Sequence, residues 1–428
     1  VASVGTTDVG PGQMSPHRML TTTVTDQNRL HTQMRGKTIG ISLKDRGAIL
    51  PAGHTANAAY WFEGGDEGKW ITSTFYMNEL PKWVQDFNAS AKAKNYLKEW
   101  NTLKPIESYL ESGADLSPYE GGFRGKEQAV FPYDLSALAE KNGGYSLLKS
   151  TPYGNNLTTD FAIEAIDAEN LGQDADTDFL VISYSATDYV GHNFGVNSKE
   201  VEDTYIRLDQ DLAWLLKTLD QKVGKGKYTV FLTADHGAVN VPAYLSDQKI
   251  PSGYFDNRAF ETALNEFVVS EYGKEGLIED ISNYQVFFNY ENLTAADINA
   301  EDLQKKIAHF ALQYDLMDKV YTRAELNQAN YTSGVAALIQ KGFNQKRSGD
   351  VFLVLDPGVI SYSRTGSTHG SAFSYDTHAP LLFYGAGIKK GKTYELTEIP
   401  DIAPTISALL GIEFPNGTTG KVIAEVLK

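Results

Sequence analysis

Three short apolar runs in the chain each lie beside a carboxylate and an imidazole. Residues 179–185 and 228–234 are rich in β-branched and aromatic side chains, and residues 379–384 form a third run of this kind. Short apolar runs bounded by polar residues and glycine are typical of buried strands in a parallel sheet. The pattern predicts three strands, two followed and one preceded by residue types that bind metals.

A helical spacing of apolar side chains separates the first two predicted strands. The helix is expected to begin at Asn197-Ser198 and to end near Gly224, with apolar residues recurring at steps of three and four: Val201, Tyr205, Leu208, Leu212, Leu215 and Leu219. Because a helix of this length connects parallel strands, residues 178–237 are predicted to form a βαβ unit.

Other segments have simpler signals. Ser15-Pro16 predicts a helix start, with the helix reaching about Met34. The alternation of Ile39, Ile41 and Leu43 predicts a strand over residues 37–43, and further helices are expected over 156–171 and 399–411.

Two long segments are less regular. Residues 53–155 are rich in aromatic and turn residues, and we expect an insertion over the active-site end of the sheet. Residues 238–346, with helical patterns at 258–272 and 301–314 and a strand at 284–288, are expected to be a second insertion or a small α+β subdomain. The core is predicted to resume with a strand at 350–355. The fold class is therefore α/β: one domain over residues 1–428, with a mostly parallel sheet flanked by helices and with inserted subdomains.

The amino-acid composition limits the kinds of molecule that the chain is expected to bind. Against 54 acidic residues the chain has 38 Lys and Arg, so its formal charge of −16 opposes binding of nucleic acid, and no basic patch is evident. No apolar stretch approaches the roughly twenty residues that a membrane span needs. Cysteine is absent, which excludes disulfides. The sequence carries no signal for an oligomeric state.

The carboxylate and imidazole pairs predict a two-metal site. They are Asp188 with His192, Asp235 with His236, and Asp376 with His378. An isolated pair of this kind is more often a turn or a helix cap. Three pairs at strand ends are harder to explain that way, because ligands of open α/β sheets gather beyond the strand ends. Oxygen and nitrogen donors without thiolate favour zinc or another first-row divalent ion.

Lys44 and Arg46 follow the strand at 37–43. Continued alternation puts both on one side, where they are either a solvent-exposed basic pair or an anion clamp for a phosphate dianion.

Together these motifs resemble the alkaline phosphatase superfamily. The resemblance rests on TDYVGH at 187–192, TADHG at 233–237, DTH at 376–378 and the helix opening DIAPT at 401–405. The stretch SLKDRGA at 42–48 is similar to the PafA-type bacterial alkaline phosphatases, which share a core with the nucleotide pyrophosphatase/phosphodiesterases.

The resemblance implies roles for individual residues. Asp188, His192 and His378 would hold one zinc ion, and Asp235 and His236 the other. Lys44 and Arg46 would contact the phosphoryl oxygens. Asp376 and His369 would support the site without binding metal. The resemblance further implies small-molecule phosphate monoesters as substrates, a covalent phospho-threonine or phospho-serine intermediate, and a periplasmic or secreted enzyme.

The opening of the chain departs from this resemblance. The family begins with a strand that ends in a metal-binding aspartate, followed by a helix bearing the nucleophile, and no such strand precedes Ser15. We expect an N-terminal segment to be missing, the nucleophile to lie outside this chain, and the chain alone to have weak or no activity. The alternatives are a phosphodiesterase, sulfatase or phosphonate hydrolase of the same fold, a mutase-like relative, and a noncatalytic metal-binding fragment.

Overall fold

The computed structural model describes all residues from Val1 to Lys428. The chain folds into two compact units, one of residues 1–235 with 380–428 and the other of residues 236–379. Each has its own hydrophobic core. The prediction of one domain with two insertions remains a prediction.

The first unit is built on a five-stranded sheet of order β1-β4-β3-β2-β7. Its strands are β1 (Ser3–Val4), β2 (Thr38–Ser42), β3 (Ala58–Glu63), β4 (Lys69–Ser73) and β7 (Phe179–Ser183). β2 pairs in parallel with both β3 and β7, whereas β4 pairs antiparallel with β3 and with β1. The α/β class is confirmed, and the sheet is mixed rather than mostly parallel. β3 and β4 come from the segment expected to be an insertion, whose position over an active-site end remains a prediction.

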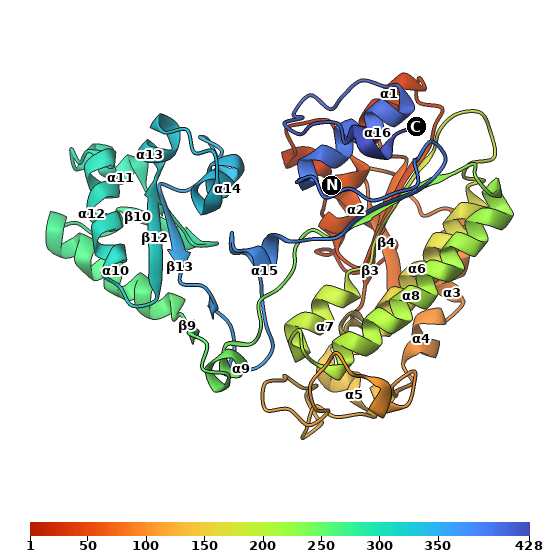
Figure 1. Cartoon of the computed structure of the whole chain (residues 1–428), viewed down its shortest axis with the longest axis horizontal. Helices are drawn as coiled ribbons and strands as arrows, with labels where there is room; N and C mark the ends of the chain where they lie inside the picture. Colours follow the sequence, from red (N-terminus) through yellow and green to blue (C-terminus); the bar gives the residue numbers. More distant parts are fainter. The chain divides into compact units, whose positions relative to one another are not determined.

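Helices cover both faces of this sheet (Figure 1). Helix α2 (Asp45–Ala52) packs on β2 and β3, and α6 (Pro152–Ala168) packs on the other face together with α3 (Lys82–Ala89). The alternation of β3 explains both contacts, because Trp61 joins the cluster containing Ala48 and Ile49 of α2, whereas Tyr60 contacts Phe161 of α6.

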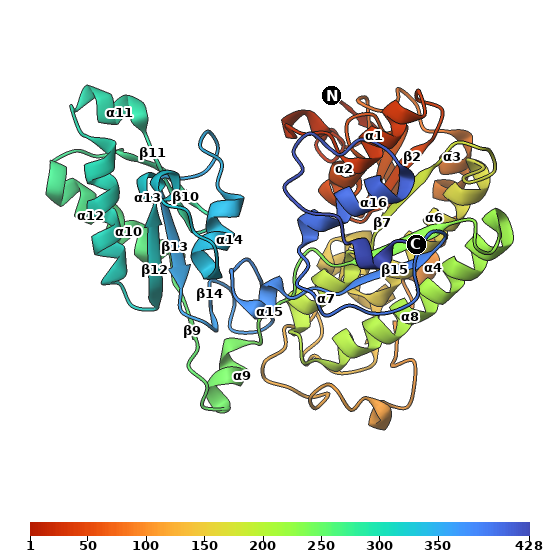
Figure 2. The ribbon, with the colours of Figure 1, turned by 45° about the horizontal axis from the view of Figure 1, so that its top comes forward.

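The remaining elements of the first unit surround this core. A short hairpin pairs β5 (Glu99–Trp100) with β6 (Tyr133–Asp134). Helices α1 (Val24–His31) and α16 (Ile402–Leu410) lie side by side (Figure 2). The other α-helices are α4 (Lys92–Tyr96), α5 (Leu135–Leu138), α7 (Ala186–Phe194) and α8 (Lys199–Leu219). Apart from one short 3-10 turn, Ile106–Ser108, residues 101–132 between these two strands form a loop.

Two sequence predictions for this unit are wrong. The helix expected over 15–34 is divided into a 3-10 turn, Pro16–Arg18, and α1, because Thr23 caps a new helix by accepting from the Asp26 amide. The expected βαβ unit does not form either: β8 (Thr229–Thr233) pairs antiparallel with β15 (Leu381–Gly385) in a separate two-stranded sheet and is not hydrogen-bonded to β7.

The second unit contains a four-stranded antiparallel sheet of order β10-β11-β13-β12. Its strands are β10 (Ile278–Ser282), β11 (Gln285–Phe288), β12 (Met317–Thr322) and β13 (Val351–Leu355). β13 was expected to return the chain to the main core, but it pairs with β11 and β12. The strand at 284–288 is confirmed.

Helices and a short parallel pair complete the second unit. The pair is β9 (Gly253–Tyr254) with β14 (Val359–Ile360). The helices are α9 (Pro242–Asp247), α10 (Asn257–Tyr272), α11 (Tyr290–Ala295), α12 (Ala300–Leu312), α13 (Arg323–Gln328), α14 (Gly334–Gly342) and α15 (Ser374–Thr377). α10 and α12 confirm the two predicted helices. No helix in the structure combines the length and apolar character needed to cross a bilayer.

Candidate functional site

The carboxyl ends of β2 and β7 bring the first candidate residues together. The strands are parallel and in register, with Ser42 opposite Ser183, so both chains leave the sheet at the same edge. Gly47 lets α2 approach this edge, because a Cβ at that position would lie 2.6 Å from the Ser42 hydroxyl. The following segments, which carry Lys44 and Asp188, therefore meet.

Helix α7 carries Asp188 and His192 one turn apart. Its first amide, at Ala186, donates to the Asn155 side chain of α6 over 3.1 Å, which fixes the start of the helix. The four-residue spacing puts both side chains on one face, with His192 Nε2 3.2 Å from Asp188 Oδ1. The other oxygen of Asp188, Oδ2, forms an ion pair with Lys44. The structure thus brings Lys44, Asp188 and His192 into one cluster.

Lys44 and Arg46 do not reach this edge by strand alternation, as the sequence had suggested. β2 ends at Ser42, Lys44 lies at the N-cap of α2, and Arg46 lies inside that helix with its side chain exposed. Both cations instead lie near Tyr189. Lys44 Nζ lies 4.6 Å from the centroid of the Tyr189 ring. Burial raises the pKa of Tyr189, and the nearby charge of Arg46 opposes that shift.

The end of α7 is held by an aromatic cage. Phe194 is 1% exposed and makes edge-to-face contacts with Trp100, Phe123 and Tyr133, at centroid distances of 5.5 to 6.0 Å. The backbone adds a bond from the Gly121 amide to the Asn193 carbonyl, 2.8 Å long. The cage therefore fixes the turn of helix that contains His192.

Residues 109–121 are also tied to the start of α8. The Gly113 amide donates to the Asn197 carbonyl over 2.7 Å, and Glu202 accepts from both the amide and the hydroxyl of Ser112. The loop between β5 and β6 is thereby fixed to the junction between α7 and α8.

Asp235 and His236 lie on adjacent positions after β8, at the boundary between the units. Asp235 lies two residues after the end of the strand and is exposed. His236 belongs to the second unit, where its Nδ1 lies 2.8 Å from the Gly237 carbonyl oxygen. The Gly237 amide donates to the Asp376 carbonyl over 2.7 Å. This bond ties the DHG segment to the loop at residues 368–378.

His369 is the imidazole that contacts His236. The two rings are stacked, with centroids 3.3 Å apart and an interplanar angle of 16°. Asp376 holds the His369 loop, because its Oδ2 accepts from the Gly370 amide and from the amide and hydroxyl of Ser371. The carboxylate is 4% exposed, so Asp376 has a structural function in this loop.

His378 lies at the end of α15 and is exposed, and its amide donates to the Ser374 carbonyl over 3.0 Å. Its assignment as a metal ligand remains a prediction.

Sequence reasoning missed Tyr189, Phe194 and the contact of His369 with His236. Tyr189 and Phe194 carry no signal of their own, because their relevance comes from side chains distant in the sequence. His369 had one usable signal: it lies within a Thr-His-Gly stretch in a glycine- and serine-rich loop.

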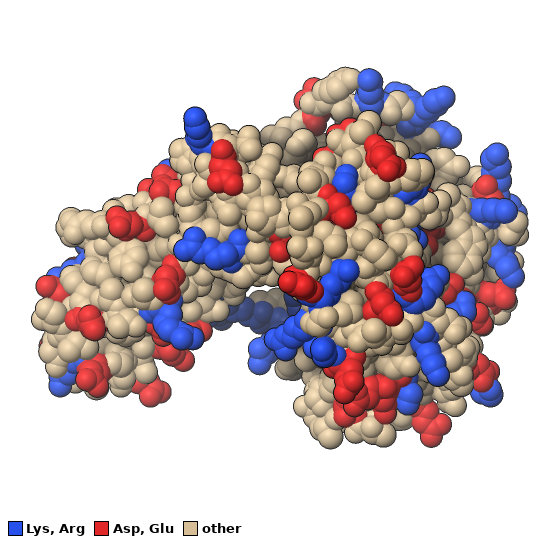
Figure 3. Space-filling model, turned by 90° about the horizontal axis from the view of Figure 1, so that it is seen from below, with Lys and Arg blue, Asp and Glu red and all other residues tan.

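Charged side chains elsewhere are dispersed. On most of the face seen in Figure 3, acidic and basic groups are interspersed. The absence of a nucleic-acid partner remains an expectation.

Comparison with known proteins gives consistent matches over most of the chain. A family model described as type I phosphodiesterase / nucleotide pyrophosphatase matches residues 17–380. Alkaline phosphatase PafA from Elizabethkingia meningoseptica is 43% identical over 430 residues, which cover 100% of this chain and 78% of the relative.

Two further relatives match over a similar length. Alkaline phosphatase PhoV from Synechococcus elongatus is 44% identical over 429 residues. The match covers 100% of this chain and 77% of PhoV. A Myroides odoratus protein named calcium-transporting ATPase is 48% identical over 425 residues, covering 97% of this chain and 77% of its own length.

The fold agrees with a solved structure. The crystal structure of wild-type alkaline phosphatase PafA superposes with a TM-score of 0.95 at 43% identity, covering 100% of this chain and 82% of that chain.

Proposed function

The chain belongs to the type I phosphodiesterase / nucleotide pyrophosphatase family, with the PafA-type alkaline phosphatases, and from this premise we propose a zinc-dependent mechanism for it. Its activity is that of a phosphomonoesterase of the alkaline phosphatase superfamily. The proposal concerns the metals, the intermediate and the residues that act. It includes the periplasmic or secreted location that the resemblance implies.

The donor set fits zinc. Two tetrahedral ligands about 2.0 to 2.1 Å from a zinc ion are about 3.3 Å apart. His192 Nε2 and Asp188 Oδ1 are separated by 3.2 Å, which matches the spacing of two ligands of one zinc ion. This distance is the observation that carries the proposal. Asp188, His192 and one further imidazole would hold one ion, and Asp235 with His236 would hold the second.

Two histidines are candidates for the third ligand of the ion held by Asp188 and His192. The resemblance implies His378. The contact between His369 and His236 favours His369, because an imidazole stacked on one proposed ligand lies close to where the metals are expected. We therefore include His369 as a candidate ligand beside His378.

Lys44 and Arg46 would bind the phosphoryl group. Asp188 uses Oδ1 on the His192 side and Oδ2 on the Lys44 side, so Lys44 stays beside the proposed metal when Asp188 binds it. The Lys44 ammonium has three donors, so those not used by Asp188 are available to a phosphoryl oxygen. Two cations match a dianionic monoester better than a monoanionic diester.

The reaction would proceed in two displacements. The bond from phosphorus to the leaving alcohol breaks as a bond forms to a threonine or serine oxygen, and water then cleaves the phospho-enzyme. Zinc ions, when bound, polarise phosphoryl oxygens and lower the pKa of a hydroxyl or water. We assign the nucleophile to no residue of this chain.

Comparing an aryl phosphate monoester with the matching diester tests the substrate class. We expect faster monoester hydrolysis. Replacing Lys44 and Arg46 with alanine should lower monoester turnover by roughly 100-fold and weaken inhibition by inorganic phosphate, with a smaller effect on the diester. Lys389→Ala, a surface lysine, is the matched control. Dominant diester cleavage, or equal losses on both substrates, would favour the phosphodiesterase alternative that the family description suggests.

A further inference from the structure

The outer face of β13 forms one wall of a cavity in the second unit. Val351, Leu353 and Leu355 point into the core beneath α10 and α12. Phe352 and Val354 point the other way by the alternation of the strand, yet they are only 9% and 7% exposed. Helix α14 and the loop at residues 368–377 cover them. These elements leave a cavity of about 330 Å³ between them.

The lining of this cavity is largely apolar and aromatic. Phe352, Val354, Leu338, Ile339, Phe373 and Tyr375 contribute to it. Cavities from about 300 to 1,000 Å³ with apolar walls are typical of small-molecule sites, and this one is at the lower limit. Its size suits one aromatic ring or a branched alkyl group rather than a whole nucleotide.

The cavity adjoins the candidate site through His369. His369 is one of its lining residues, and the ring of His369 stacks on that of His236. The loop that forms this wall is fixed by Asp376, whose Oδ2 accepts three hydrogen bonds from Gly370 and Ser371. The wall is therefore preorganised and contacts a residue that we assign to the metals.

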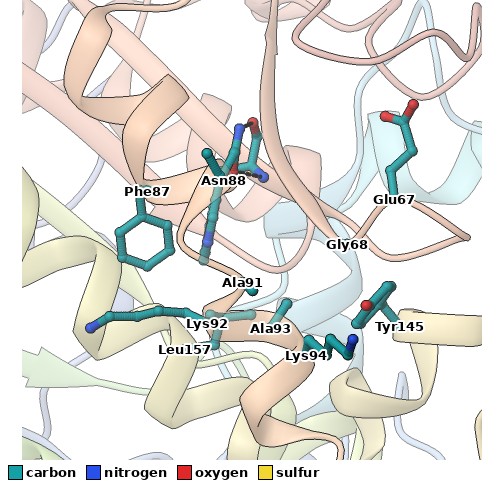
Figure 4. Close-up of a pocket in the computed structure, with 12 residues that line it drawn as sticks. Glu67, Gly68, Phe87, Asn88, Ala91, Lys92, Ala93, Lys94, Tyr145 and Leu157 are labelled. Carbon is teal, nitrogen blue, oxygen red and sulfur yellow. Dashed lines mark hydrogen bonds between the residues drawn. The ribbon is translucent and has the colours of Figure 1, made fainter.

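Another cavity, in the first unit, lacks such a link. It measures about 170 Å³ and is lined by α3, α4 and neighbouring residues (Figure 4). Its Lys92 extends towards Phe87 and pairs with Asp160 over 3.1 Å. None of its lining residues is a candidate site residue.

We propose that the cavity beside His369 binds the apolar alcohol portion of a phosphate monoester, so that aryl and branched alkyl esters are the preferred substrates. This inference rests on the proposed function, because it needs the phosphoryl group to be held at the metals for which His236 and His369 are proposed ligands. Burying one aromatic or branched side group there should strengthen binding roughly 10- to 100-fold.

Two substitutions change the cavity without touching the proposed metal ligands. Gly342→Leu adds a bulky side chain at a position that lines the cavity, and no neighbour has to move for it, because a Cβ at Gly342 meets nothing within 4 Å and its backbone is not in the left-handed region. Leu338→Asp adds a charge to the wall at a residue that is 39% exposed, so folding should persist. Leu312→Asp, on α12 at 51% exposure and outside the cavity, is the control.

Binding of two nonhydrolysable phosphonates by the metal-loaded protein tests the proposal. Calorimetry should show phenylphosphonate binding about 10-fold or more tighter than methylphosphonate. Gly342→Leu and Leu338→Asp should remove that difference, leave methylphosphonate affinity unchanged, and lower kcat/KM for phenyl phosphate relative to methyl phosphate. Leu312→Asp should change nothing.

Three outcomes would overturn the proposal. If the wild-type protein binds both phosphonates equally, the cavity proposal fails while the proposed function stands. If the cavity variants weaken both ligands alike, the cavity does not hold the alcohol portion. If the metal-loaded wild-type protein binds neither phosphonate, the proposed phosphoryl-binding function itself fails.

Discussion

The two parts of the candidate site are built differently. In the first unit, Asp188 and His192 lie on a helix that is fixed at its start by Asn155 and at its end by the cage around Phe194. In the second unit, His236, His369 and His378 lie on loops or at the end of a one-turn helix, and Asp376 accepts hydrogen bonds from the loop that follows His369. A rigid helix sets ligand spacing before any metal binds, whereas loops rely on a few polar contacts.

The largest expected effect comes from the helical part. Asp188→Ala removes a proposed ligand and the partner of Lys44, so monoester turnover should fall roughly 1,000-fold, with loss of one bound metal. Turnover and metal content measured on the same sample check this. Asp209→Ala, at an exposed position on α8, is the control. Retention of full activity by Asp188→Ala would show that α7 carries no metal ligand.

The second largest effect is expected from substitutions in the aromatic cage around Phe194. Phe194→Ala opens a cavity in a packed aromatic cluster and should cost about 3–5 kcal/mol of unfolding free energy. Because Phe194 lies two residues from His192, zinc affinity should also fall, and Phe194→Leu should restore much of both. Urea unfolding and zinc titration of the two variants measure these quantities. If Phe194→Ala is destabilised but binds zinc with unchanged affinity, the cage contributes to folding stability and not to metal binding.

In the second unit, substitutions should distinguish His369 from His378 as the metal ligand. We expect His369→Ala to weaken metal binding and turnover about 10- to 100-fold, a range typical of altered metal surroundings, and His378→Ala to have little effect. Zinc titration and monoester kinetics of both variants decide the assignment. The reverse order of effects would support the ligand set that the resemblance implies.

A buried acidic pair beside the cage should make the first unit sensitive to pH. Burial raises the pKa of Glu200 to about 7, and burial together with Glu200 and Asp115 raises that of Glu120 to about 9. Both pKa values exceed the ordinary value of 4.5, so the folded state binds more protons than the unfolded state. The stabilisation is complete below about pH 4.5 and is lost as pH rises through 7 and towards 9.

Urea unfolding at pH 5, 7 and 9 measures this dependence. Glu200→Gln keeps an acceptor for Tyr133 and should reduce the fall in unfolding free energy by about 2 kcal/mol. The same pH dependence in wild type and Glu200→Gln would exclude Glu200 as its source.

The same comparison shows what the sequence alone can predict. The alternation of Ile39, Ile41 and Leu43 and the helix start at Ser198 are local patterns, and the structure confirms the elements that they predict. Sheet order is not local. The pairing of β8 with β15, and that of β13 with β11 and β12, depend on segments distant in sequence, so both were mispredicted.

Contacts across the sequence also explain the residues that were missed. Tyr189 gains its relevance from Lys44, and Phe194 from Trp100 and Phe123, about 70 to 145 residues away. The contact of His369 with His236 is of the same kind. Motif spacing identifies residue types, and the structure is needed to show which of them touch.

Counting bound zinc tests the central claim most directly. Elemental analysis of the protein equilibrated with zinc and freed of loosely bound ions should give two zinc ions per chain. Asp188→Ala with His192→Ala should give one, and Asp235→Ala with His236→Ala should also give one. Two ions retained in either double variant, or none bound by the wild-type protein, would contradict the assignment of these four residues.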